Sequence, residues 1–153
     1  MRYAILLAAA GVLAGTTTLA AQAAPALKWG PAPAVFPAGA QMAVVSGDPG
    51  KAGPFTIELS MPAGYKIAPH SHPTDEKVTV DKGTFLVGMG DTFDAAKANT
   101  MTAGKSGEIK AGMHHYAMAK SATVVTINST GPFAMTYVNP ADDPSKATAA
   151  KPY

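Results

Sequence analysis

The strongest constraint on the fold of this chain is a series of short strand-like runs that recurs about every ten residues. Turn-forming glycine, proline and aspartate residues separate each run from the next. Residues 55–61 alternate strictly between apolar and polar side chains, which is typical of a strand with one buried face. The further runs are 42–45, 78–81, 84–89, 108–109, 115–118, 124–127 and 133–138. Only 95–98 suggests a helical turn, so the pattern predicts an all-β sandwich or barrel.

The beginning of the chain follows a different pattern. Residues 1–23 start with the positive charge of Arg2, continue with an apolar run and end in Ala-Gln-Ala at 21–23. This three-part order is that of a cleavable secretory signal peptide. Threonines at 16–18 interrupt the apolar run before it reaches the roughly 20 residues that a membrane-spanning helix needs. We therefore expect a periplasmic or secreted protein that has no membrane attachment after removal of the signal.

The rest of the chain divides into an arm, one domain and a tail. Residues 24–41 are rich in proline and alanine, which disfavours both a helix and a central strand. We expect an extended arm, with Trp29 and Phe36 as anchors on the barrel. Residues 42–140 form the predicted barrel, and 141–153 form a predicted flexible tail. Removing 23 residues from 153 leaves 130, which is enough for one domain with an adequate core and no disulfides, as the absence of cysteine requires.

The charged residues exclude some classes of function. Arg2 is the only arginine, so the chain without its signal carries eleven scattered lysines against ten carboxylates. A nucleic-acid surface needs clustered lysine and arginine, so we expect no nucleic-acid partner. The lack of arginine also argues against a clamp for a carboxylate or phosphate substrate. Because cysteine is absent, any metal site must use imidazole and carboxylate ligands.

The four histidines predict a metal site. Side chains alternate along a strand, so His70 and His72 point to the same side. Glu76 follows after a short loop and can return beside them on the next strand. Two imidazoles and a carboxylate provide three ligands for a divalent metal. A fourth ligand can come from His114 or His115, but these neighbours face opposite sides of a strand, so only one of them can join the cluster.

Two segments resemble the conserved motifs of the cupin family. Residues 64–83 resemble the first cupin motif, with every fixed position at the expected spacing, namely Gly64, His70, His72, Glu76 and Gly83. Residues 104–119 resemble the second motif through Gly104, Gly112 and His115. Two positions of that motif depart from the family pattern, namely Lys110 in place of proline and Ala119 in place of asparagine.

The resemblance covers about residues 42–138 and implies a cupin β-barrel, which is a double-stranded β-helix or jelly roll. It implies His115 as the fourth ligand beside His70, His72 and Glu76, and it leaves His114 facing outward or behind the ligands. The ion would be one divalent transition metal, among Mn, Fe, Ni, Co, Cu and Zn. Cupins often pair through their sheets, so the resemblance also allows a homodimer.

Two functions are compatible with such a site. The first is a metal-dependent enzyme, similar to cupin dioxygenases, that acts on a small organic molecule, with Glu76 as a ligand or as a base. The second is a non-catalytic cupin module that binds a metal or a small ligand.

Other polar residues could assist the metal ligands. Tyr65, Tyr116 and Tyr137 could each supply a hydroxyl, although packing within the sheets is the more common role of strand tyrosines. We expect Tyr116 to face away from its neighbour His115. Glu58 lies on the polar face of residues 55–61, which is either the interior or the solvent side; on the interior it would be a candidate proton carrier.

Overall fold

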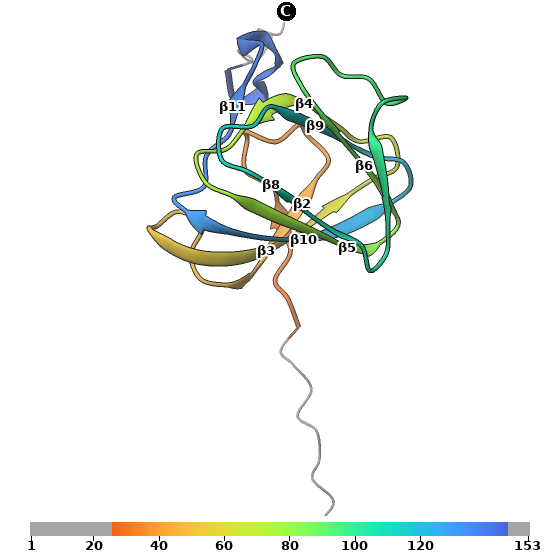
Figure 1. Cartoon of the computed structure of the whole chain (residues 1–153). Helices are drawn as coiled ribbons and strands as arrows, with labels where there is room; N and C mark the ends of the chain where they lie inside the picture. Colours follow the sequence, from red (N-terminus) through yellow and green to blue (C-terminus); the bar gives the residue numbers. More distant parts are fainter. Residues whose placement is uncertain (1–25, 147–153) are drawn as a thin grey trace, which may run out of the picture.

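The computed structural model describes residues 26–146, so the predicted signal peptide at 1–23 lies outside the described residues. The start of the predicted arm, 24–25, and the end of the predicted tail, 147–153, lie outside them as well. The described chain folds into two antiparallel β-sheets that face each other, as Figure 1 shows. The all-β prediction is confirmed.

The first sheet has six strands in the order β1-β2-β3-β10-β5-β8. Their bounds are β1 (Gly30–Pro31), β2 (Gln41–Ser46), β3 (Gly53–Met61), β10 (Thr123–Gly131), β5 (Glu76–Lys82) and β8 (Ser106–Ile109). The second sheet has five strands in the order β11-β4-β9-β6-β7. Their bounds are β11 (Thr136–Tyr137), β4 (Lys66–Ser71), β9 (His115–Ala119), β6 (Thr84–Met89) and β7 (Asn99–Thr102).

The core lies between the two sheets and follows from side-chain alternation. In β3 the apolar residues Phe55, Ile57, Leu59 and Met61 are all buried, as the strict alternation of this strand predicts. Each such side chain contributes about 1.5–3 kcal/mol when it leaves water. Glu58 lies between them in sequence and points to the outer face, where it is partly exposed. Among the described residues, the buried polar or charged side chains are the four of the candidate site together with Thr123 and Asp143.

Three segments differ from the sequence prediction. Residues 95–98 form a hydrogen-bonded turn rather than a helical turn: the Lys97 amide donates to the carbonyl of Asp94 at 3.1 Å, and the Asp94 carboxylate accepts from the Ala96 amide at 3.0 Å. Of the predicted strand 133–138, only β11 is a strand. The strand β7, which is mostly polar, was not predicted.

The described helical elements are two short 3-10 turns, η1 (Pro140–Asp142) and η2 (Pro144–Lys146). No helix within residues 26–146 has the length and apolar character needed to cross a membrane.

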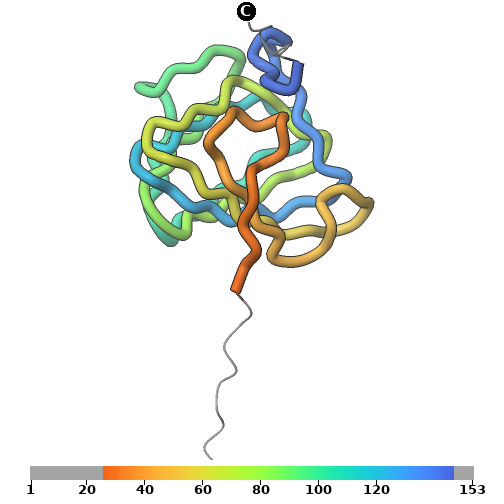
Figure 2. The backbone as a smooth tube through the Cα atoms, turned by 180° about the vertical axis from the view of Figure 1, so that it is seen from behind, coloured from red at the N-terminus to blue at the C-terminus, as the bar shows by residue number. Residues whose placement is uncertain are grey.

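The arm folds back onto its own sheet. β1 pairs with Gln41 and Met42 of β2, and the loop between them, residues 32–40, is named the strap below. Figure 2 shows this orange segment running up one side of the barrel and turning back on itself. Phe36 is 5% exposed, so its prediction as an anchor is confirmed. Trp29 is 40% exposed, so its prediction as an anchor is wrong: it lies at the outer edge beside β2 and not over the core.

Candidate metal centre

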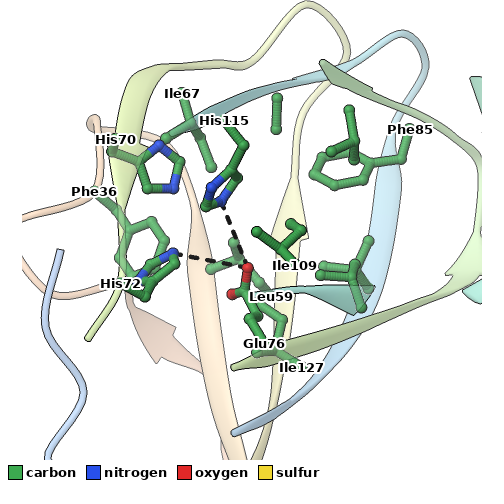
Figure 3. A pocket seen from close by; sticks show the side chains of 14 residues that line it. Phe36, Leu59, Ile67, His70, His72, Glu76, Phe85, Ile109, His115 and Ile127 are labelled. Carbon is green, nitrogen blue, oxygen red and sulfur yellow. Dashed lines mark ion pairs between the residues drawn. The ribbon is translucent and has the colours of Figure 1, made fainter. Parts of the chain in front are cut away.

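Three buried histidines converge inside the barrel. His70 and His115 are direct partners across the pairing of β4 with β9, and His72 follows the end of β4. Their ring centroids lie 4.2 Å apart for His70 and His115, 4.9 Å for His70 and His72, and 5.2 Å for His72 and His115. Each ring offers a nitrogen within 4.8 Å of those of the other two. Figure 3 shows the three rings turned toward the interior of the barrel.

A β-bulge in β4 aims these histidines inward. The pairing with β9 changes register between Ile67 and His70. Ile67, His70 and His72 all line the same cavity, although the two histidines follow Ile67 by three and five positions. Strict alternation would place Ile67 and His70 on opposite faces. A bulge adds one residue and re-aims the side chains that follow it, which lets this strand contribute first to the core and then to the site.

Glu76 comes from the opposite sheet. It is the first residue of β5 and is 5% exposed. Its Oε2 lies 3.7 Å from Nε2 of His72 and 3.6 Å from Nε2 of His115, the two contacts drawn as dashed lines in Figure 3. These separations are too long for hydrogen bonds but suit oxygen and nitrogen atoms that share one cation. Glu76 lies outside the tight group formed by the three histidines.

The hydrogen bonds of the three rings determine which nitrogen faces the cavity. Nδ1 of His70 lies 2.7 Å from the carbonyl of Ala68, Nδ1 of His72 lies 2.8 Å from that of Ala134, and Nδ1 of His115 lies 3.1 Å from that of Met113. A carbonyl oxygen only accepts, so each Nδ1 must be the donor. With Nδ1 as the donor, the neutral form of each ring has its unprotonated Nε2 on the interior side, which is the tautomer that ligates a metal. This donor set fits a divalent transition metal.

The wall around the histidines is otherwise apolar. The cavity offers about 30 Å³ to the centres of water-sized molecules, whereas one water needs about 10–15 Å³ by this measure. Its polar lining residues are the three histidines and Glu76. The apolar lining residues are Phe36, Leu59, Ile67, Val78, Phe85, Val87, Ile109, Ala117, Val125 and Ile127. A molecule that enters meets polar contacts only at the histidines and Glu76.

Comparison with known proteins identifies the fold. No protein-family model and no curated protein matches this sequence. Among solved structures, a proposed acetylacetone dioxygenase from Methylibium petroleiphilum PM1 aligns with a TM-score of 0.58 and 23% identity, over 82% of this chain and 88% of its own. A cupin superfamily protein from Desulfitobacterium hafniense (TM-score 0.51, 9% identity, 60% of this chain and 76% of its own) also aligns. So does an RmlC-like cupin from Shewanella frigidimarina (TM-score 0.51, 16% identity, 61% and 78%).

The chain has the cupin fold. In this barrel, burial keeps the candidate ligand His70 neutral. The pKa of His70 falls to about 3, first because burial penalises the charged ring and then because His115 and His72 lie beside it. The hydrogen bond to Ala68 acts in the opposite direction but is weaker. Near neutral pH, His70 is thus neutral and need not lose a proton to serve as a metal ligand.

The lowered pKa of His70 makes the metal-free protein sensitive to acid. An unfolded histidine has a pKa of about 6.5. Below that pH, His70 is therefore protonated in the unfolded chain but stays unprotonated in the folded protein. The contribution of this group to stability is complete above pH 6.5 and is lost as the pH falls from 6.5 toward 3. We expect His70 alone to lower the free energy of unfolding by about 2 kcal/mol at pH 5. Urea denaturation of metal-free protein at pH 7 and pH 5 measures this loss, and an equal loss in His70→Gln would contradict the assignment to His70.

Tyr65 and Tyr137 do not present hydroxyls to the histidines. The Tyr65 hydroxyl donates to the carbonyl of Pro37 at 2.5 Å, and the Tyr137 hydroxyl donates to that of Val35 at 2.8 Å. The Tyr137 ring contacts His70 with centroids 5.9 Å apart, but its hydroxyl is directed to the strap. Burial raises the pKa of Tyr137 to about 12 and also raises the pKa of Tyr65. Both hydroxyls therefore stay protonated and hold the strap.

Tyr116 and Glu58 lie away from the site. Tyr116 faces away from His115, as predicted, and its hydroxyl donates to the carbonyl of Asp94 at 2.9 Å. Of the two alternatives for Glu58, the structure shows the solvent side: Glu58 stands on the outer face of β3 and is therefore no candidate proton carrier. The pKa of Glu58 is raised by partial burial and then by the nearby Asp81, which reflects its place on the outer sheet surface.

His114 and Lys110 also have defined places in the structure. His114 points outward with a side chain 44% exposed, and its Nδ1 lies 2.6 Å from the carboxylate of Asp91. Lys110, which stands where the cupin motif has proline, bonds Asp75 at 2.8 Å and Glu108 at 2.6 Å. These contacts hold the turn before β9, where Met113 donates to the carbonyl of Lys110 at 3.1 Å.

Three residues near the site were not predicted there. Asp75 accepts a hydrogen bond from the Ala111 amide at 2.9 Å and so joins the loops of the two motifs. Phe133 packs against His72 with ring centroids 5.2 Å apart. Phe36, predicted only as an anchor, lies on the cavity wall itself. Of these three residues, only Asp75 could have been placed near the site from the sequence, because it directly precedes Glu76.

Proposed function

We propose that this protein is an exported cupin that binds one divalent transition metal through His70, His72, His115 and Glu76. We propose further that it is a dioxygenase-type enzyme for a small organic molecule. One observation carries the proposal: three buried imidazoles converge, and the Nδ1 atom of each is hydrogen-bonded to a backbone carbonyl. Three unprotonated Nε2 atoms beside one carboxylate are a donor set for a metal, and they would be costly to bury without one.

The lining of the cavity supports a small, largely apolar substrate that binds through oxygen atoms. Among the described residues, no lysine or arginine lines the cavity, so a carboxylate substrate would find no cationic partner beyond the metal. A β-diketone fits this chemistry because its two oxygens can chelate a metal while its alkyl groups contact the apolar wall. The likeness to a proposed acetylacetone dioxygenase supports the same substrate class.

The residues of this chain would divide the work of such a reaction. A bound metal would supply Lewis acidity toward the substrate oxygens and redox chemistry with dioxygen. Glu76 is the only carboxylate among the described residues that line the cavity, so when it does not ligate the metal it is the group there that can accept a substrate proton. The apolar wall, with Phe36, Leu59 and Ile127 around the ligands, would exclude water and orient the alkyl groups.

Oxygen uptake tests this function. Metal-free protein is reconstituted separately with Fe(II), Mn(II), Ni(II), Co(II), Cu(II) and Zn(II), and each form is assayed with a panel of small diketones. We expect diketone-dependent oxygen consumption with at least one redox-active metal, and a loss of about 10²–10⁴-fold in rate for Glu76→Gln. Metal binding without turnover across the panel would instead support a non-catalytic binding module. The small volume of the cavity favours that alternative.

Export has a test of its own. The proposal rests on the signal-like residues 1–23. N-terminal sequencing of protein recovered from the periplasm or the medium should begin near Ala24 or Pro25. A mature protein that still starts at Met1 would contradict the cleavage.

A further inference from the structure

We propose that the strap closes the metal cavity with the Phe36 side chain and thereby limits the size of the molecule that reaches the histidines. This inference deepens the proposed function and rests on it for the identity of the ligand. The placement of Phe36 itself is independent of any metal.

Phe36 connects the strap to the candidate ligands. It lines the same cavity as His70 and His72, and Figure 3 shows its ring on the side of the cavity where these two histidines lie. Its ring stacks on Phe133 with centroids 5.8 Å apart and planes inclined by 8°. Phe133 in turn packs against His72 at 5.2 Å. A ring in this position occupies space that a ligand larger than a few atoms would need.

Two buried tyrosines of the barrel hold the strap on either side of Phe36. The Tyr65 hydroxyl binds the carbonyl that follows Phe36, on Pro37, and the Tyr137 hydroxyl binds the carbonyl that precedes it, on Val35. Both tyrosines are buried, at 7% and 5% exposure. The strap therefore has a defined seat, and the two hydroxyls position the Phe36 ring.

The strap has its own internal bonds as well. At its base, the Ala32 amide donates to the carbonyl of Ala40 at 3.0 Å. The Phe36 amide donates to the carbonyl of Pro33 at 2.8 Å, which closes a turn just before the ring. The strap is thus a loop that is closed at its base and has a turn of its own before Phe36.

The strap is also the part of the wall that can move without breaking the barrel. Every other residue that lines the cavity lies in a strand of the two sheets, except His72 at the end of β4. Displacing any of these would disrupt strand pairing. Phe36 is attached through the two tyrosine bonds, the loop base and the two-residue strand β1. Because the cavity offers only about 30 Å³ to water-sized centres with Phe36 in place, a larger ligand requires displacement of this ring.

The first experiment needs no metal. Benzene is titrated into metal-free wild type, Phe36→Ala and Phe55→Ala, while the backbone amide signals of Ile67 and Ala117 are followed by NMR. Phe55 is the matched control because it also packs on Phe133, at 6.0 Å, but does not line the cavity. We expect benzene to bind Phe36→Ala at least about tenfold more tightly than the other two proteins, as in other engineered apolar cavities.

If either alanine variant fails to fold, the milder pair Phe36→Leu and Phe55→Leu should show the same order. Equal benzene binding by wild type and the Phe36 variant would overturn the proposal, and so would an equal gain in the Phe55 variant.

The second experiment compares ligand sizes on Co(II)-loaded protein by visible absorption. We expect the dissociation constant of azide to stay within about twofold in Phe36→Ala, while that of benzimidazole falls at least about tenfold, because only the larger ligand needs the space of the ring. Tight benzimidazole binding by wild type would overturn the size limit. A wild type that fails to bind Co(II) would count against the proposed function, and the benzene experiment would then decide on Phe36 alone.

The role of the tyrosines is tested by hydrogen exchange of the Phe36 amide. Tyr65→Phe and Tyr137→Phe each delete one bond to the strap, so we expect this amide to exchange at least about tenfold faster in the double variant. Tyr116→Phe is the control, because it deletes a hydroxyl bond to a backbone carbonyl on the opposite side of the sheet from His115. An unchanged exchange rate in the double variant would show that the tyrosines do not position the strap.

Discussion

His115→Gln should lower the affinity for a divalent metal by at least about 100-fold, whereas His114→Gln should leave it unchanged. The two histidines are neighbours in β9 and in the turn before it, but they face opposite sides of the sheet. His115 is 2% exposed and belongs to the three converging imidazoles, whereas His114 lies outside and bonds Asp91. Glutamine keeps a polar side chain of similar size but does not provide an imidazole lone pair.

Elemental analysis and competition with a coloured chelator measure this effect. Wild type and His114→Gln should carry about one metal per chain, and His115→Gln should lose it during dialysis. The double variant His70→Ala with His72→Ala should lose it as well, because it removes two of the three imidazoles. Equal metal content in the variants of His114 and His115 would exclude the barrel interior as the site.

The sequence alone predicted the features that depend on local pattern. The strict alternation of residues 55–61 indicated a strand with one buried face, and the spacing of His70, His72 and Glu76 indicated three side chains that could meet. Alternation could not choose between His114 and His115, because it separates two faces without saying which one is inside. The cupin motif made that choice, and the structure places His115 with the other histidines. The same ambiguity explains why Glu58 could be considered for the interior.

The remaining features depend on contacts between distant parts of the chain. The bonds from Tyr65 and Tyr137 to the strap join residues 28 and 102 positions apart, and no local pattern indicates such pairs. The bulge between Ile67 and His70 is a property of the pairing with β9. Trp29 and Phe36 both sit in a proline-rich segment and have similar character, so only the packed structure shows that one is exposed and the other lines the cavity.

Metal removal should lower the melting temperature of the wild type by roughly 10–20 °C. A ligand that binds only the folded state stabilises it by about 4 kcal/mol at a concentration 1,000 times its dissociation constant. For a domain of about 130 residues, each kcal/mol corresponds to a shift of roughly 3–5 °C. We expect metal binding to stabilise the folded state in this way, because three histidine Nε2 atoms and a carboxylate that is 5% exposed share an otherwise apolar cavity. Calorimetry with excess metal and with excess EDTA measures the difference.

Glu76→Leu separates the stabilisation by metal from ordinary packing. The leucine side chain has a similar volume and matches the apolar wall, so it removes the cost of burying a carboxylate between the two sheets. We expect metal-free Glu76→Leu to melt at or above the temperature of metal-free wild type, while the increase on adding metal becomes much smaller. A large drop in its metal-free melting temperature would mean that Glu76 is kept for contacts within the protein. Identical melting curves of the wild type with and without metal would contradict a metal centre at these four residues.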